Sequence, residues 1–185
     1  MKKDFFGWLL LGMIVAAVFY LYNHLNAPED EAQQLVQVAD AQVPTQLHPL
    51  VKEKTNTLIQ RTAAIGITMF ITDGFRSSTD QEALYAQGRT SNGSIVTNAR
   101  GGQSYHNYGL AVDFALKNAQ GQAIWNMQYD GNGNGKADWM EVVEIAKDLG
   151  FDWGGDWPGF KDYPHLQMDF GLSISQLQQG YRPKE

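Results

Sequence analysis

A chain of 185 residues that is 43% hydrophobic can form one globular domain of ordinary size with an appendage. The net charge of −6 and the absence of a Lys/Arg run in its body argue against a nucleic-acid partner. The lack of cysteine excludes disulfides and thiolate metal ligands, while five Trp and eight Tyr indicate an aromatic-lined surface or cleft.

Residues 1–25 predict a single-pass transmembrane anchor. The segment from Phe5 to Leu25 is almost entirely apolar, and a helix of that length spans roughly 30 Å, about one hydrocarbon thickness. Lys2 and Lys3 precede it and acidic residues follow, so the positive-inside rule places the rest of the chain in the periplasm or on the extracellular side of the inner (cytoplasmic) membrane. A cleaved signal peptide and a buried soluble helix are the alternatives, although the segment ends in Tyr20-Leu21-Tyr22 rather than in small residues.

The following residues predict a linker and then one α+β domain. Residues 26–46 are polar, acidic and rich in Gln, as expected of a linker, and residues 47–185 predict a small mixed, mainly antiparallel sheet flanked by helices. Amphipathic spacing, a capping box at 79–82 and stop glycines predict helices over 47–65, from 79 to about 88, and over 140–149. Strands are predicted over 67–72, over 109–116, up to 124 after a turn at 118–121, and over 164–170, with loops at 93–103 and 153–157.

Two short stretches carry residues that can bind a metal. His106 and Asp113 lie in the first, and Asp162 and His165 lie about fifty residues later. Two His and one Asp can hold zinc while one position stays open for water, and a further carboxylate can activate that water. The pattern therefore predicts a metallohydrolase, although Asp162 alone can also be the first residue of a turn.

The three possible metal ligands have structural alternatives. His106 can be a hydrogen-bonded loop residue, and His165 can face solvent at the start of a strand. Asp113 lies within an apolar strand, where a carboxylate is costly unless it is paired or bound to metal. A salt bridge to Arg76 or Arg100 is the non-metal alternative for it.

The order and content of six motifs resemble those of a known family. The chain is similar to the L-alanyl-D-glutamate peptidases, which belong to the VanY/D-Ala-D-Ala carboxypeptidase-like (peptidase M15) zinc metallopeptidases, from about residue 47 to residue 170. The resemblance is carried by Gly74-Phe75-Arg76-Ser77, Leu84-Tyr85-Ala86-Gln87-Gly88-Arg89, Ile95-Val96-Thr97-Asn98-Ala99, the His106–Asp113 stretch, Trp153-Gly154-Gly155-Asp156-Trp157 and Asp162-Tyr163-Pro164-His165-Leu166-Gln167.

The resemblance implies a role for each residue of the predicted centre. It implies that His106, Asp113 and His165 bind zinc and that Asp162 is the general base. It also implies that Arg76 binds or polarises the scissile carbonyl, so that zinc and Arg76 together stabilise the oxyanion. An ordinary ion pair at the end of a strand is the alternative role for Arg76.

Five further residues are expected around the centre. Ser104, Tyr105 and Gln167 can orient metal ligands or substrate. Trp153 and Trp157 can form a wall of the cleft, and packing in the core is an equal alternative for either.

A second metal site is predicted from a twelve-residue loop. Residues 130–141 fit the calcium-loop pattern D-x-[DN]-x-[DN]-G-x5-E without a gap. The pattern assigns as ligands Asp130, Asn132, Asn134, the Lys136 carbonyl, Asp138 and Glu141. A Gly/Asn-rich turn capped by Asp138 is the alternative.

These features predict a membrane-anchored, zinc-dependent hydrolase of peptidoglycan stem peptides that cleaves the L-Ala–D-Glu bond. A D-Ala-D-Ala carboxypeptidase, or another L,D- or D,D-endopeptidase with the same zinc site, is the alternative within enzymes. An inactive wall-binding adaptor and a component of an envelope-spanning machine are alternatives of another class. Phage lysis and wall remodelling are both compatible biological settings.

Overall fold

The computed structural model describes residues 35–37 and 43–184. The predicted transmembrane anchor lies outside this range, as does most of the predicted linker. Within the described ranges, no helix combines the length and the apolarity needed to cross a membrane.

The predicted α+β class is confirmed. The helices are α2 (Pro49–Ala64), α3 (Ser78–Ala86), α4 (Asp138–Asp148) and α5 (Ile174–Gln178), with short 3-10 helices η2 (Tyr105–Tyr108) and η3 (Gly154–Asp156). The strands are β1 (Leu35–Gln37), β2 (Met69–Asp73), β3 (Ala111–Lys117), β4 (Ala123–Ile124), β5 (Asp152–Trp153), β6 (His165–Gln167) and β7 (Tyr181–Pro183).

Strand β3 is the centre of a five-stranded sheet. It pairs antiparallel with β2 on one side and with β6 on the other, β5 extends the sheet beyond β6, and β4 pairs with the end of β3. The strand predicted over 109–116 is present, and its residues Val112, Phe114, Ala115 and Leu116 are all fully buried. A central strand that is buried along most of its length has a nearly continuous apolar sequence.

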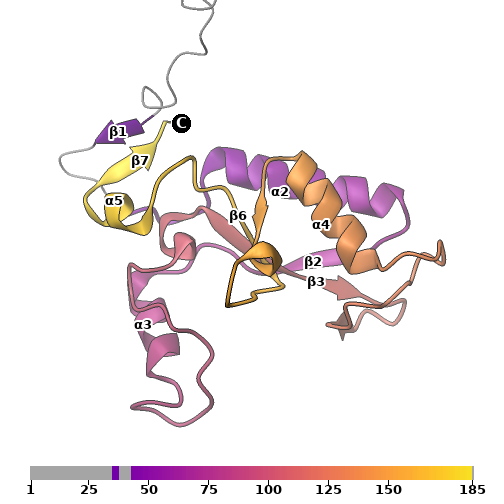
Figure 1. The fold of residues 1–185 in the computed structure, drawn as a ribbon, viewed down its shortest axis with the longest axis horizontal. Coiled ribbons are helices and arrows are strands. Elements are labelled where there is room, and N and C mark those ends of the chain that lie inside the picture. The colour runs from indigo at the N-terminus through magenta and orange to yellow at the C-terminus, as the bar shows by residue number, and fades with distance from the viewer. Residues whose placement is uncertain (1–34, 38–42, 185) are drawn as a thin grey trace, which may run out of the picture. The chain divides into compact units, whose positions relative to one another are not determined.

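Helices α2 and α4 pack side by side over one face of the sheet (Figure 1). The buried residues of α2 are Val51, Thr55, Leu58 and Thr62, which form one stripe at helical spacing. The ring of Trp139, at the start of α4, lies 4.6 Å from that of Phe114 on β3. Because successive side chains of a strand point to opposite faces, Asp113 faces away from these helices.

Most predicted element boundaries shift by one or two residues, and three further differences have clear structural causes or bear on the site. Helix α3 is capped by Ser77, whose hydroxyl accepts the Asp80 N–H at 3.1 Å, so the helix begins before the expected capping box. Strand β6 ends at Gln167 instead of continuing to Phe170, whose backbone is left-handed at φ 55°. The expected loop at 153–157 contains the end of β5 and all of η3.

Leu58→Ala should lower the free energy of unfolding by about 2–5 kcal/mol, because Leu58 is fully buried and truncation leaves a cavity. Urea denaturation followed by circular dichroism measures the change. Ile65→Ala, at a side chain that is 43% exposed just beyond the same helix, is the matched control and should change stability much less. Equal losses in the two variants would contradict this packing.

Candidate metal centre and catalytic cleft

The sheet aligns three polar side chains in a row across its open face. In the strand register, Asp113 on β3 lies opposite Asp73 on β2 and opposite His165 on β6. Directly opposed residues on antiparallel strands have Cβ atoms about 4.5–5.5 Å apart. The backbone pairing therefore places one expected ligand, His165, beside another, Asp113.

The third expected ligand, His106, comes from the short helix η2. Ser104 and Asn107 form a capping box at its start, and Asn107 is fully buried. The Asn107 amide donates to the Arg76 carbonyl at 2.9 Å, and the Arg76 N–H donates to the His106 carbonyl at 3.1 Å. Gly109 ends the helix at φ 69°, where a Cβ would lie 2.3 Å from a backbone oxygen. These contacts fix η2 against the sheet.

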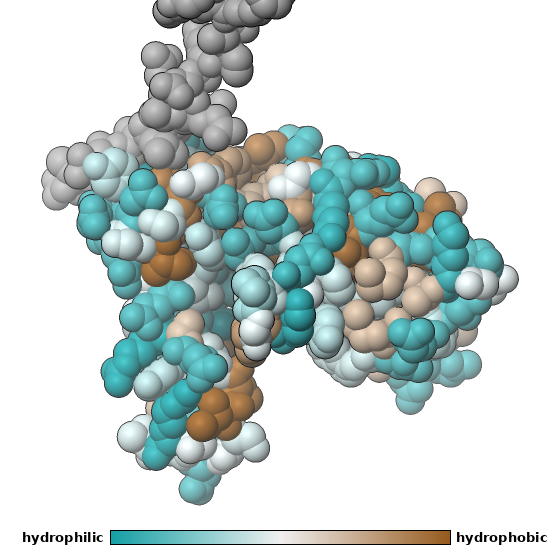
Figure 2. Space-filling view, viewed as in Figure 1, coloured by the Kyte–Doolittle hydropathy of each residue, from teal (hydrophilic) through white to brown (hydrophobic). Residues whose placement is uncertain are grey.

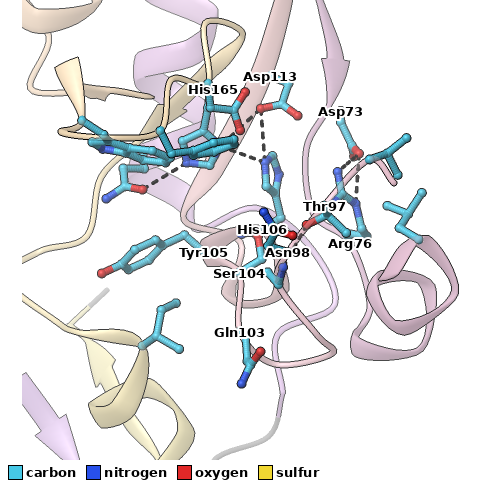
Figure 3. A pocket seen from close by; sticks show the side chains of 18 of the residues that line it. Asp73, Arg76, Thr97, Asn98, Gln103, Ser104, Tyr105, His106, Asp113 and His165 are labelled. Atoms are coloured by element: carbon cyan, nitrogen blue, oxygen red, sulfur yellow. Dashed lines mark hydrogen bonds and ion pairs between the residues drawn. The ribbon is translucent and has the colours of Figure 1, made fainter. Parts of the chain in front are cut away.

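The three candidate ligand atoms form a nearly equilateral triangle (Figure 3). His106 Nε2 and His165 Nδ1 are 3.2 Å apart, and each lies 3.3 Å from Asp113 Oδ1. A tetrahedral zinc ion with bonds of 2.0–2.1 Å separates its ligand atoms by about 3.3–3.4 Å. The triangle therefore fits three corners of a zinc tetrahedron and leaves the fourth for a reacting molecule.

Hydrogen bonds on the far side of each ring leave the facing nitrogens without protons. His106 donates from Nδ1 to the Gly74 carbonyl at 2.7 Å, and His165 donates from Nε2 to Gln167 Oε1 at 3.0 Å. In neutral rings the other nitrogens then carry lone pairs toward Asp113. Among the described residues none hydrogen-bonds to the buried Asp113 Oδ1. Three electron-rich atoms that face one another in this way suit a cation.

Asp113 needs positive charge beside it to stay ionised. Burial opposes its ionisation, but hydrogen bonds and positive charge from protonated His106 and His165 outweigh burial and hold the pKa of the carboxyl well below its usual range. A cation between the two neutral rings would supply that positive charge instead. The salt-bridge alternative for Asp113 was wrong, because Arg76 pairs with Asp73 and Arg100 pairs with Glu82.

Asp162 enters the same cleft from the turn before β6. Its N–H donates to the Gly154 carbonyl at 3.1 Å, and the packing is so close that a Cβ on Gly154 would lie 2.4 Å from the Asp162 carbonyl oxygen. Burial raises the pKa of the Asp162 carboxyl, and the negative charge of Asp113 raises it further. A raised pKa favours a carboxylate that takes up a proton during a reaction.

Arg76 is held in a fixed position beside the centre. Its Nε and Nη2 donate to Asp73 Oδ2, and its Nη1 donates to Gln81 Oε1 at 2.7 Å. Gln81 is 1% exposed and is itself held by the Ala99 carbonyl. Arg76 thus forms the ion pair expected at the end of a strand and also lines the cleft. The ion pair is therefore compatible with a role in binding a substrate carbonyl.

Some of the aromatic residues expected near the centre line the cleft, and one of them packs beneath it and holds a neighbouring turn. Trp157 lies in the cleft with its ring 5.0 Å from that of His165. Trp153 is buried, and its Nε1 donates to the Tyr163 carbonyl at 2.7 Å, which holds the turn that carries Asp162. Tyr105 lines the cleft and donates its hydroxyl to the Leu172 carbonyl at 2.8 Å.

The cleft has a volume of about 970 Å³ and an apolar rim. Ile95, Val96 and Phe160 line it and are each more than half exposed. Figure 2 shows hydrophobic surface on the segment that carries α3 and the loop after it. A cleft of this size, with apolar walls and a few convergent polar groups, suits an extended peptide better than a single ion or a very small molecule.

Three supporting residues were not predicted from the sequence. Asp73 and Gln81 hold Arg76, and Asn107 holds η2. An acidic residue at the end of a strand, three positions before an arginine, was the available signal for Asp73. Gln81 and Asn107 carried no signal, because their burial depends on tertiary packing.

Two histidines and one aspartate lie together on an antiparallel sheet, at a cleft lined by both polar and apolar residues. This arrangement indicates a metallopeptidase. A family model described as D-alanyl-D-alanine carboxypeptidase (peptidase M15) matches residues 97–168. The chain is 63% identical over 129 residues to the peptidoglycan L-alanyl-D-glutamate endopeptidase CwlK of Bacillus subtilis (strain 168), across 70% of this chain and 77% of CwlK. The chain belongs to the peptidase M15 family, as its motifs predicted.

Two further comparisons agree with this family. The L-alanyl-D-glutamate peptidase of Listeria phage A118 is 42% identical over 69 residues, which cover 37% of this chain and 22% of that protein. The crystal structure of DacB from Streptococcus pneumoniae D39 superposes with a TM-score of 0.51 at 19% identity, over 78% of this chain and 83% of that one. The latter likeness concerns the fold alone.

Gln167→Leu should weaken the binding of added zinc roughly 10–100-fold, because it removes the acceptor that fixes the His165 ring with Nδ1 toward the other two candidate ligand atoms. Competition with a chromophoric chelator measures the affinity. Gln120→Leu, at an exposed turn residue, is the control and should bind zinc as the unmodified chain does. Unchanged affinity in Gln167→Leu would contradict this positioning role.

Proposed function

We propose that this chain is a zinc-dependent peptidoglycan endopeptidase that hydrolyses the L-Ala–D-Glu bond of stem peptides. The observation that carries the proposal is the ligand triangle at the base of a peptide-sized cleft, in a chain 63% identical to CwlK. Zinc fits the triangle because the atoms are two imidazole nitrogens and one carboxylate oxygen at tetrahedral spacing.

His106, Asp113 and His165 would hold the zinc ion, which when bound acidifies a water and polarises a carbonyl. Asp162 is the general base: it accepts the proton of the attacking water and can then pass it to the leaving amine. Its burial and its proximity to Asp113 prepare it to receive that proton.

Arg76 donates hydrogen bonds to the oxyanion as charge develops on the scissile carbonyl oxygen. Asp73 and Gln81 engage three of its N–H groups and so fix the guanidinium before substrate arrives. A donor fixed in advance requires little reorganisation during the reaction, which is the condition for effective oxyanion stabilisation. The apolar rim at Ile95, Val96 and Phe160 limits the access of bulk water once a peptide is bound.

Asp162→Asn should reduce hydrolysis of muropeptides by roughly 10²–10⁴-fold while zinc content stays the same, because the variant loses the base and keeps all three ligands. Product release by chromatography and zinc by atomic absorption measure the two quantities. Asp156→Asn is the matched control in the same segment, since its side chain is half exposed and forms a surface ion pair with Lys147. A rate equal to that of the unmodified chain would remove Asp162 from the mechanism.

Mass spectrometry of the same digests identifies the scissile bond. Cleavage between L-Ala and D-Glu leaves L-Ala on the glycan strand and releases a peptide that begins with D-Glu. Loss of a terminal D-Ala alone would instead support the carboxypeptidase, which the description of the matching family model favours. Binding to peptidoglycan without any product would support the inactive adaptor.

We further propose that residues 1–25 anchor the enzyme in the cytoplasmic membrane with residues 47–185 on the outer side. The apolar segment with basic residues before it and acidic residues after it supports this placement. The full-length chain should remain in the membrane pellet after alkaline carbonate extraction, and a chain that begins at Asn26 should be released. Release of both forms, or recovery of a shortened mature chain, would favour a cleaved signal peptide.

A further inference from the structure

The loop over residues 130–141 is a densely hydrogen-bonded polar segment outside the cleft. None of its residues lines the cleft, so the proposed hydrolysis makes no use of it. It joins the segment after β4 to helix α4, which begins within it at Asp138. Its hydrogen bonds and its one unsatisfied oxygen point to a ligand.

Asp130 organises the loop around its own carboxylate. One oxygen accepts the N–H groups of Gly133 and Asn134 at 2.8 and 3.1 Å, and the other accepts that of Gly135 at 2.9 Å. Gly133 and Gly135 are left-handed, at φ 73° and 85°, which lets the chain wrap tightly. The backbone therefore already has the sharp turn that a twelve-residue calcium loop requires.

Three side chains of the loop converge on one point. The Asn134 amide nitrogen lies 2.9 and 3.1 Å from the two Glu141 carboxylate oxygens, and the Asn132 amide nitrogen lies 3.2 Å from one of them. These are the third, fifth and twelfth positions of the loop. Rotation of the two Asn side chains, which gives up their hydrogen bonds to the Ile65 carbonyl and to two backbone N–H groups of the loop, would turn their oxygens toward a cation beside Glu141.

An independent observation comes from Asp138, which is only 3% exposed. Its Oδ2 accepts the Gly131 N–H at 3.0 Å, but its buried Oδ1 has no hydrogen-bond partner among the residues that the structure describes. A buried carboxylate oxygen without a hydrogen-bond partner, in a loop that carries two further carboxylates, is unfavourable without a counterion.

We infer that residues 130–141 bind one calcium ion. The ligands are the side-chain oxygens of Asp130, Asn132, Asn134 and Glu141 and the Lys136 carbonyl, and Asp138 completes the shell directly or through one water. The all-oxygen set and the flexible loop suit calcium; zinc prefers nitrogen and sulfur, and magnesium requires stricter octahedral geometry. With neutral Asn at two positions, the dissociation constant should lie at about 10⁻⁴–10⁻³ M.

The ion would link the end of α2 to the start of α4, the two helices that pack on one face of the sheet. Asn132 lies against the end of α2, because a Cβ on Gly66 would be 3.3 Å from the Asn132 Cβ, and Asp138 and Glu141 belong to the first turn of α4. Trp139, next to Asp138, packs against Phe114 of the central strand. Calcium binding should therefore raise the thermal stability of the whole domain.

The test uses the full-length chain in a mild non-ionic detergent, freed of other metals and loaded with one equivalent of zinc. Calcium at about 10 mM should raise the Tm by roughly 3–10 °C, and the same concentration of magnesium should not. Terbium should bind in place of calcium and luminesce when Tyr129 or Trp139 is excited, and added calcium should quench that signal. An unchanged Tm with calcium, or an equal rise with magnesium, would overturn the inference.

Glu141→Gln removes one ligand charge with little change of shape and should abolish both the Tm rise and the terbium signal. Glu144→Gln is the matched control, because it removes the same charge from an exposed position one turn further along α4. A full calcium response in Glu141→Gln would place the ion elsewhere. Since neither readout involves hydrolysis, Asp162→Asn should respond to calcium normally, and failure here leaves the peptidase proposal intact.

Discussion

The structure depends on one electrostatic constraint, the buried carboxylate of Asp113 in the middle of the central strand. Its Oδ1 faces two imidazole nitrogens at 3.3 Å that have no protons to donate in the neutral tautomers. Without a positive charge among these three atoms, the arrangement would oppose folding. The chain therefore keeps the site through contacts from outside: sheet register holds Asp113 beside His165, while the Gly74 carbonyl and Gln167 hold the two rings.

The alternation of a β-strand explains how so polar a centre exists within a well-packed domain. Phe114 packs against Trp139 under the helices, and Asp113, one residue earlier, faces the cleft. The sheet thus separates an apolar face, which supplies the stability, from a polar face, which supplies the chemistry. Each polar residue on that face has a fixed partner: Arg76 is held by Asp73 and Gln81, and Asp162 by its turn against Gly154.

The sequence predicted most of what depends on residue type and local pattern. Helices α2 and α4 were anticipated from amphipathic spacing and strand β2 from its strand-forming residues. His106, Asp113 and His165 were anticipated from residue types that can bind a metal and from the anomaly of a carboxylate in an apolar strand. What depends on tertiary packing was not accessible. Gln81 is an ordinary helical residue until α3 is placed beside Arg76, and α5 and β7 carry too few apolar residues to show a period. Trp153 and Trp157 have the same local context, and only the fold places one in support and the other in the cleft.

The separation of the sheet into an apolar face and a polar face also determines how the calcium loop would influence the cleft. The loop acts on Trp139 and Phe114, which lie on the helical side of the sheet, whereas the ligand rings are fixed by Gly74 and Gln167 on the other side. A rigid strand transmits little displacement between its two faces when the pairing on both edges is intact, and β3 is paired on both edges. Calcium should therefore affect the population of folded domain more than the geometry of the folded centre. Its effect on hydrolysis should be small at low temperature and should grow near the unfolding transition, because the ion acts there on the fraction of folded enzyme.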